Sequence, residues 1–197
     1  MKQITVKDIP SYCAEEKTVD IGDGYVVKIE TPYDEHHGAP WEECDGHGPV
    51  SEWTTRDKAP GERILATDRH SRRYYDFAEA VKIARRDGWD TKPYNTGTKG
   101  ERAHRAAEAD FEYLRRWCNE QWRYIGVCVT VYRNGAEIGQ DSLWGIEDDG
   151  DYWKETAAEL VNEVIHADEV NRKIAAKLKA KETRERNYWN ARDVVTV

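Results

Sequence analysis

Alternation and helical periodicity along the chain predict four strands and three helices. Residues 25–31 alternate apolar and polar side chains, which is typical of a half-buried strand, and residues 62–67 form a second short strand pattern. In three other segments apolar residues recur every three or four positions, as on one face of a helix. We expect these helices at about 74–86, at about 101–122, and from Asp151 to about Leu178.

The clearest local signal is a β-hairpin in the second half of the chain. Residues 124–132 are apolar and β-branched, and 136–146 return after Asn134-Gly135, a pair that suits a two-residue type I′ turn. Together the elements follow the order β-β-α-α-β-β-α. This order predicts an α+β fold, in which three helices cover a mainly antiparallel sheet of about four strands.

A chain of 197 residues is long enough for one sizeable domain. We expect a single domain over residues 1–180, with a long irregular acidic loop at 32–61, where Gly and Pro are frequent and no period is sustained. Residues 181–197 are expected to form a charged C-terminal extension. The last helix would be about 40 Å long and would project. Its end is therefore either solvated or packed against a second copy in a homodimer.

The charge of the chain changes the list of expected partners. The net charge is −8, and residues 1–60 alone carry −7, while residues 61–123 carry +3. Affinity for nucleic acid depends on neutralising phosphates, so free nucleic acid is not an expected partner. No apolar run could span a bilayer, and no signal peptide is recognisable at the N-terminus. We therefore expect a soluble, intracellular protein without a membrane segment, with its four scattered cysteines reduced.

The irregular loop contains the candidate metal ligands. The common nucleotide-binding and hydrolase signatures are absent from the sequence. Cys44 and His47 have a spacing that allows both to reach one ion, and upstream histidines could complete a zinc site. Three interpretations remain open: a surface loop without metal, a structural zinc, and a catalytic zinc with Glu42 or Glu43 as base. The candidate ligands are His36, His37, Cys44 and His47.

The same loop also has the composition of a protein-binding surface. Two tryptophans bracket a stretch of acidic residues that contains no Lys or Arg. Aromatic anchors in a field of one charge sign suit a basic protein partner, and carboxylates can also imitate the phosphates of nucleic acid. Alternatively, the tryptophans cover the sheet and the acids are solvated. The candidate partner-binding residues are Trp41, Glu42, Glu43, Asp45, Glu52 and Trp53.

A cluster of arginines precedes the first predicted helix. Arg69, Arg72 and Arg73 are candidates for binding an anion. However, cations at a helix N-terminus are mildly unfavourable, and the acidic loop offers partners within the chain. Pairing with that loop is therefore the simpler interpretation.

One segment resembles a known protein family. Residues 40–63 read PWEECDGHGPVSEWTTRDKAPGER, and the resemblance continues through YDFAEA at 75–80, DGW at 87–89, FEYL at 111–114 and SLWGIE at 142–147. The sequence is similar to a mostly uncharacterised family of small proteins from tailed bacteriophages and prophages. This resemblance implies a phage accessory protein that acts in the cytoplasm of a bacterial host. Such proteins often bind and disable a host or defence component.

The preferred hypothesis is a non-enzymatic phage protein that inhibits a host or anti-phage defence protein through the acidic, Trp-bearing segment. Two alternatives remain. One is a zinc-dependent enzyme centred on the His36/His37/Cys44/His47 loop. The other is a protein that sequesters an anionic signalling nucleotide with the arginines around Arg72.

Overall fold

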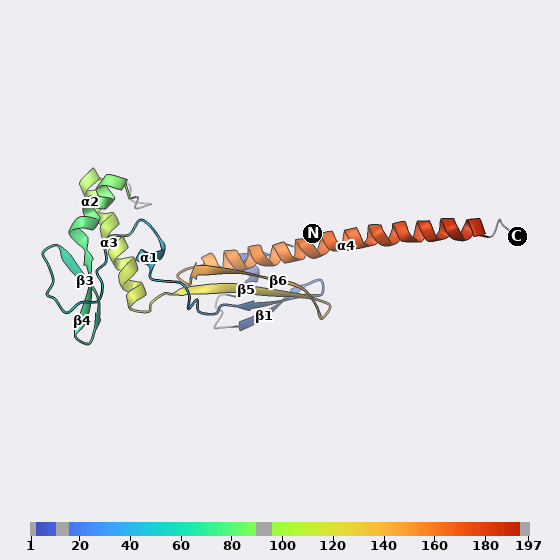
Figure 1. Ribbon diagram of the computed structural model, residues 1–197, viewed down its shortest axis with the longest axis horizontal. Coiled ribbons are helices and arrows are strands. Elements are labelled where there is room, and N and C mark those ends of the chain that lie inside the picture. Colours follow the sequence, from blue (N-terminus) through green and yellow to red (C-terminus); the bar gives the residue numbers. More distant parts are fainter. Residues whose placement is uncertain (1–2, 11–15, 90–95, 194–197) are drawn as a thin grey trace. The chain divides into compact units, whose positions relative to one another are not determined.

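The computed structural model describes residues 3–10, 16–89 and 96–193, with side chains described up to residue 190 (Figure 1). Contacts group the chain into two compact units, one made of residues 1–33 with 125–197 and the other of residues 34–124. The sequence indicated a single domain over 1–180, whereas the contacts divide that range between two units. We describe each unit by itself.

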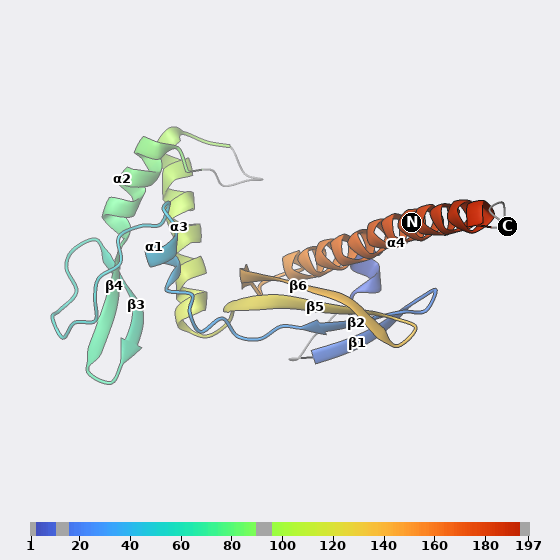
Figure 2. The same ribbon diagram turned by 45° about the vertical axis from the view of Figure 1, so that its right-hand side comes forward.

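The first unit is a four-stranded sheet with one long helix on one face. The strand order is β1 (Glu16–Gly22), β2 (Tyr25–Glu30), β5 (Tyr124–Arg133) and β6 (Ala136–Glu147), and β2 pairs antiparallel with both β1 and β5. Helix α4 (Tyr152–Asp193) lies along this sheet, and the short 3-10 helix η1 (Val6–Asp8) is next to it (Figures 1 and 2). Valines and isoleucines of β2 and β5 form the core with the first turns of α4.

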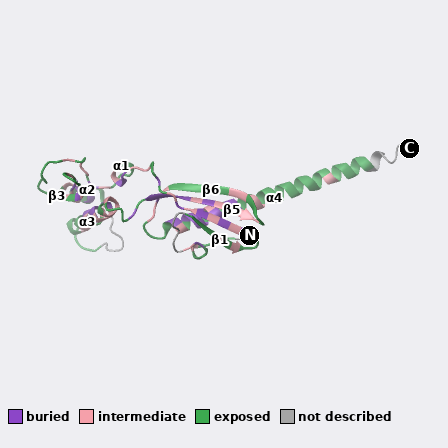
Figure 3. Cartoon of the chain, turned by 90° about the horizontal axis from the view of Figure 1, so that it is seen from below, coloured by how far each residue is buried: buried purple, intermediate pink, exposed green. Residues whose placement is uncertain are grey.

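Only the first half of α4 is packed. Asn162 fixes it to the N-terminal segment, because its side chain accepts from Ile4 N at 2.8 Å and donates to Ile4 O at 2.9 Å. Beyond residue 168 the helix is mostly exposed, as the green segment in Figure 3 shows. We predicted that the helix ends near Leu178, and this prediction was wrong, because α4 extends to Asp193. It continues through most of the expected extension, because Ala, Lys, Glu and Arg favour a helix and no Gly or Pro interrupts them.

The second unit combines two helices with a two-stranded antiparallel sheet. The sheet consists of β3 (Glu62–Asp68) and β4 (Ser71–Asp76), followed by α2 (Phe77–Asp87) and α3 (Lys99–Cys118) (Figure 2). The core is made by the side chains Leu65, Tyr75, Ala80, Ala107, Phe111 and Leu114. The short helix α1 (Pro40–Glu43) belongs to this unit too.

The loop 44–61 forms no regular strand, but isolated β-bridges to β4 hold part of it in place. Val50 forms a β-bridge with Tyr75, and Thr54 forms another with Arg72. Between them, Ser51 N donates to Tyr74 O at 2.8 Å. The predicted irregular loop is therefore ordered along the open edge of β4.

The predicted α+β fold class and its mainly antiparallel sheet are confirmed. At the hairpin turn, Asn134 and Gly135 have φ values of 51° and 80°, both positive as a type I′ turn requires. Strands β1 and β4 were not predicted, and the helix expected from residue 74 begins at Phe77 because residues 71–76 form β4. Helix α3 ends at Cys118, four residues earlier than expected. Among the described residues, no helix combines the length and hydropathy needed to cross a membrane.

Candidate functional site

The predicted zinc ligands do not converge. His36 and Cys44 are exposed, His37 packs its ring against Tyr124, and His47 faces α3 instead. In the part of the chain that the structure describes, no three His, Cys, Asp or Glu side chains form a group that could hold a metal ion. The geometry of these residues therefore gives the zinc site no support, and it stays a prediction.

The side chain of Asp110 on α3 binds three donors from distant parts of the sequence. His47 Nδ1 lies 2.6 Å from Asp110 Oδ1, while Gly48 N donates to Oδ2 at 2.8 Å and Tyr75 Oη donates to Oδ2 at 2.6 Å. An ionised carboxylate can only accept hydrogen bonds, so the Nδ1 atom of His47 carries the hydrogen. The Asp110 cluster (Asp110, His47, Gly48 and Tyr75) thus attaches the irregular loop to both α3 and β4.

Tyr75 acts in this cluster as a fixed donor. Its side chain is fully buried. Burial, and then the hydrogen bond to Asp110, raise the pKa of Tyr75 far above its ordinary range. The phenol therefore keeps its hydrogen, and it is a positioning group rather than a base.

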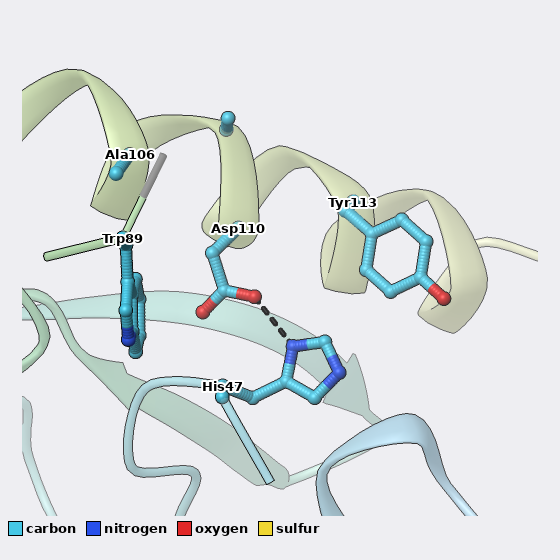
Figure 4. A pocket seen from close by; sticks show the side chains of 7 residues that line it. His47, Trp89, Ala106, Asp110 and Tyr113 are labelled. Atoms are coloured by element: carbon cyan, nitrogen blue, oxygen red, sulfur yellow. Dashed lines mark hydrogen bonds and ion pairs between the residues drawn. The ribbon is translucent and has the colours of Figure 1, made fainter. Parts of the chain in front are cut away.

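A pocket of about 330 Å³ opens beside this cluster (Figure 4). Its lining residues are Gly46, His47, Trp89, Ala106, Ala109, Asp110 and Tyr113. Trp89 lies on one side of Asp110 and Tyr113 on the other, with His47 across from the helix. The His47 ring stacks nearly parallel to Tyr113, with ring centres 5.6 Å apart and an angle of 7° between the planes. Since Nδ1 is already hydrogen-bonded to Asp110, only the Nε2 atom of the imidazole is available for a hydrogen bond with a ligand.

Arg73 connects the two tryptophans that were predicted to bind a partner. Its guanidinium carbon lies 4.9 Å from the ring centre of Trp41 and 5.0 Å from that of Trp53, both within cation–π range. Trp41 also packs edge-on against Trp117 of α3, with ring centres 5.3 Å apart. Trp53 remains 44% exposed. The arginine that we expected at an anion site therefore contacts aromatic faces and holds an exposed indole.

The predicted acidic residues divide into two groups. Glu42 and Glu43 accept hydrogen bonds from the backbone N–H groups of Ala39, at 3.3 Å, and Gly38, at 3.0 Å. They thus stabilise the beginning of α1. Asp45 and Glu52 are exposed.

The other predicted anion-binding residues, Arg69 and Arg72, are also exposed. Arg69 has a positive φ of 49° in the tight β3–β4 turn. Of this arginine cluster, only Arg73 is held by the two indoles.

Three of the four cysteines lie among the described residues. Cys44, Cys118 and Cys128 are free thiols, in agreement with the expectation of reduced cysteines, while Cys13 lies outside the described residues. Burial raises the pKa of Cys118 to about 11, so that thiol stays protonated at neutral pH.

Sequence reasoning named His47 but not the residues that define its surroundings. Asp110 and Tyr113 come from α3, Tyr75 comes from β4, and Trp89 follows the end of α2. No local spacing relates these four residues to the loop. The only sequence signal was an acidic residue beside the apolar stripe of the second helix, which is also an ordinary solvated position.

Comparisons with models of protein families, with curated proteins and with solved structures find no match to this chain. The resemblance to phage proteins therefore stays a prediction. Two features of the second unit bear on function, the Trp41–Arg73–Trp53 contact and the pocket beside His47.

Proposed function

We propose that this chain acts by binding another protein through one surface of the second unit. We call it the tryptophan surface and define it by Trp41, Glu42, Glu43, Asp45, Glu52, Trp53 and Arg73. The observation that carries the proposal is the contact of Arg73 with both indoles, which leaves Trp53 about half exposed.

The composition of this surface supports the proposal. Trp and Arg are enriched among the residues that dominate the binding energy of protein interfaces. Because Arg73 contacts the ring of Trp53, that indole has less side-chain freedom to lose when a partner binds. The exposed carboxylates Asp45 and Glu52 would attract a partner with a basic face.

The resemblance of residues 40–63 to phage proteins supports the biological part of the proposal. In that context the chain is an accessory protein that inhibits a host or anti-phage defence component in the bacterial cytoplasm. If the partner normally binds nucleic acid, the carboxylates of the tryptophan surface take the place of phosphates. No specific observation favours the zinc enzyme or the nucleotide-sequestering protein over this function.

The test compares capture of bacterial proteins by the wild-type chain, by Trp53→Ala and by Trp144→Ala. Trp144 is a matched control, since it is 49% exposed but lies on β6 in the other unit. The captured protein is then purified and its affinity is measured. We expect Trp53→Ala to weaken binding by about 2 kcal/mol, which is about 30-fold, and Trp144→Ala to leave it unchanged.

A second variant tests the charge of the surface. Asp45→Lys combined with Glu52→Lys should slow association without disturbing α1, because these two carboxylates are exposed and have no part in the cap of that helix. Charge reversal at Glu42 or Glu43 is a poorer choice, since it removes hydrogen bonds to the backbone. If Trp53→Ala and the double variant both retain the partner at wild-type affinity, the proposal is wrong.

A further inference from the structure

The pocket beside His47 presents negative charge, a hydrogen-bond acceptor and aromatic faces. Of its seven lining residues, Asp110 alone has a charged side chain when His47 is neutral, and none is Lys or Arg. An anionic ligand such as a phosphate would therefore meet a carboxylate and no cation. The chemistry of the lining favours a positively charged ligand.

The imidazole of His47 is oriented as an acceptor. Its Nδ1–H is directed to Asp110 at 2.6 Å, and this carboxylate is itself held by Gly48 N and Tyr75 Oη. With the proton fixed on Nδ1, a neutral His47 has its lone pair on Nε2. A carboxylate behind an imidazole also makes the other ring nitrogen a better acceptor. A ligand in the pocket should therefore donate a hydrogen bond to Nε2.

The walls of the pocket suit a flat group. Trp89 and Tyr113 are the aromatic walls on either side of Asp110 (Figure 4). The side chains of the lining residues Ala106 and Ala109 are small, so they leave space in the pocket. A volume of about 330 Å³ lies near the lower end of the range for ligand pockets. It provides room for a single large side chain.

We propose that this pocket receives the guanidinium of an arginine on the partner protein. Arginine is planar, has donors but no acceptor, and stacks on aromatic faces, so it matches a lining that combines an acceptor nitrogen with two aromatic side chains better than lysine does. The acidic residue Asp45 precedes the pocket residue Gly46 in the chain and is exposed. Its charge adds to the attraction of a cation.

This inference rests on the proposed function, because it takes the ligand from the same protein partner. The pocket and the tryptophan surface are neighbours on α3. Tyr113 stacks with His47, and Trp117, one helical turn later, packs against Trp41. One partner could therefore contact Trp53 and insert an arginine beside His47 at the same time.

The test uses the full chain and a small probe, so it does not require the partner. N-acetyl-arginine-methylamide is titrated while NMR signals of the Trp89 indole and the His47 ring are followed. The neutral isostere N-acetyl-citrulline-methylamide, which keeps the shape but lacks the charge, is titrated in parallel. We expect shifts at these two side chains, with binding of the arginine probe about ten-fold tighter than that of the citrulline probe.

Ala109→Leu should abolish these shifts by filling the pocket from an exposed position on α3. Ala176→Leu is the matched control, because Ala176 is exposed on α4 in the other unit. The inference is overturned if no shifts occur, if the two probes bind equally, or if Ala109→Leu leaves the arginine shifts intact. A failed titration together with partner binding that still depends on Trp53 would reject this pocket and keep the proposed function.

Discussion

The Nδ1 atom of His47 donates a hydrogen bond to Oδ1 of Asp110 at 2.6 Å, across 63 residues of sequence. The contact joins the irregular loop to α3. Gly48 N adds a second hydrogen bond from the loop to the same carboxylate, and Tyr75 Oη extends the connection to β4. A structural zinc was one of the interpretations that the sequence left open for this loop. The partly buried carboxylate of Asp110 anchors the loop.

Asp110→Asn should destabilise the second unit by about 2 kcal/mol, because an amide weakens the hydrogen bonds that the carboxylate accepts and turns a donor toward other donors. Urea unfolding followed by tryptophan fluorescence measures this, since five of the eight tryptophans lie in residues 34–124. Tyr75→Phe is the matched comparison. It removes one of the three donors and should cost about 1 kcal/mol. If Asp110→Asn costs no more than Tyr75→Phe, the carboxylate does not have the central role assigned to it.

The ion pair between Arg56 and Glu62 predicts a loss of stability in acid. Hydrogen bonds from Arg56, and from Ala59 N at 2.7 Å, hold the pKa of Glu62 below its ordinary value of 4.5. At a pH between the lowered pKa of Glu62 in the folded chain and its ordinary pKa in the unfolded chain, the unfolded chain binds more protons than the folded chain. The contribution of Glu62 is therefore complete above 4.5 and is lost as the pH falls through the lower, folded value.

The measurement is urea unfolding of the wild type, Glu62→Gln and Arg56→Gln at a series of pH values across and below 4.5. Both variants should show a shallower decrease of stability in acid than the wild type, since each removes the interaction that lowers the pKa of Glu62. An acid limb that is unchanged in both variants would contradict the prediction.

The same substitution at two glycines should have opposite effects. Gly135 has a φ of 80° in the hairpin turn, so Gly135→Ala forces a side chain into the left-handed region and should cost about 1 kcal/mol. Gly100 lies in the first turn of α3 with open space where its Cβ would be, so Gly100→Ala should stabilise that helix by about 0.5 kcal/mol. Amide hydrogen exchange reports on each unit separately. Effects of the same sign at both positions would be inconsistent with this account.

The exposed part of α4 predicts self-association, which is one of the two outcomes that the sequence left open for the end of this helix. Ile174 and Leu178 are 51% and 55% exposed on a helical segment that has little tertiary packing, and such segments are only marginally stable alone. A second copy that covers this stripe would remove both side chains from water. Sedimentation equilibrium should therefore show a dimer that dissociates on dilution.

The variant Ile174→Gln with Leu178→Gln should shift this equilibrium toward the monomer. The control Lys173→Gln with Lys177→Gln alters neighbouring exposed positions on the same helix and should leave the dimer in place. A wild-type chain that is monomeric at every concentration would show that the stripe has another role.

Local chemistry was sufficient to predict the elements that depend on neighbours in the sequence. The Asn134-Gly135 turn requires two residues that tolerate positive φ, and both have it. The apolar stripe of α3 was predicted from spacing alone, and Ala103, Ala107, Phe111 and Leu114 are buried as expected. Such features can be predicted because turn geometry and helical period are properties of a few consecutive residues.

Strand β4 could not be predicted in this way. Its sequence SRRYYD shows no alternation, because Tyr74 and Tyr75 are both buried, one after the other. Tyr74 donates to Arg56 O at 2.8 Å, and Tyr75 reaches Asp110. Two buried neighbours are possible on a strand only when both faces of the sheet are covered, which is a property of the tertiary structure.

The sequence by itself thus determined the α+β composition of the chain, the hairpin, the long last helix and the residues of the loop that deserve testing. The tertiary structure decided how those residues are combined. It joined Arg73 to both predicted tryptophans, separated His47 from the other predicted zinc ligands, and gave it Asp110 as a partner. The physical reason is that hydrogen bonds and cation–π contacts depend on distance in space, and these partners are 20 to 63 residues apart in sequence.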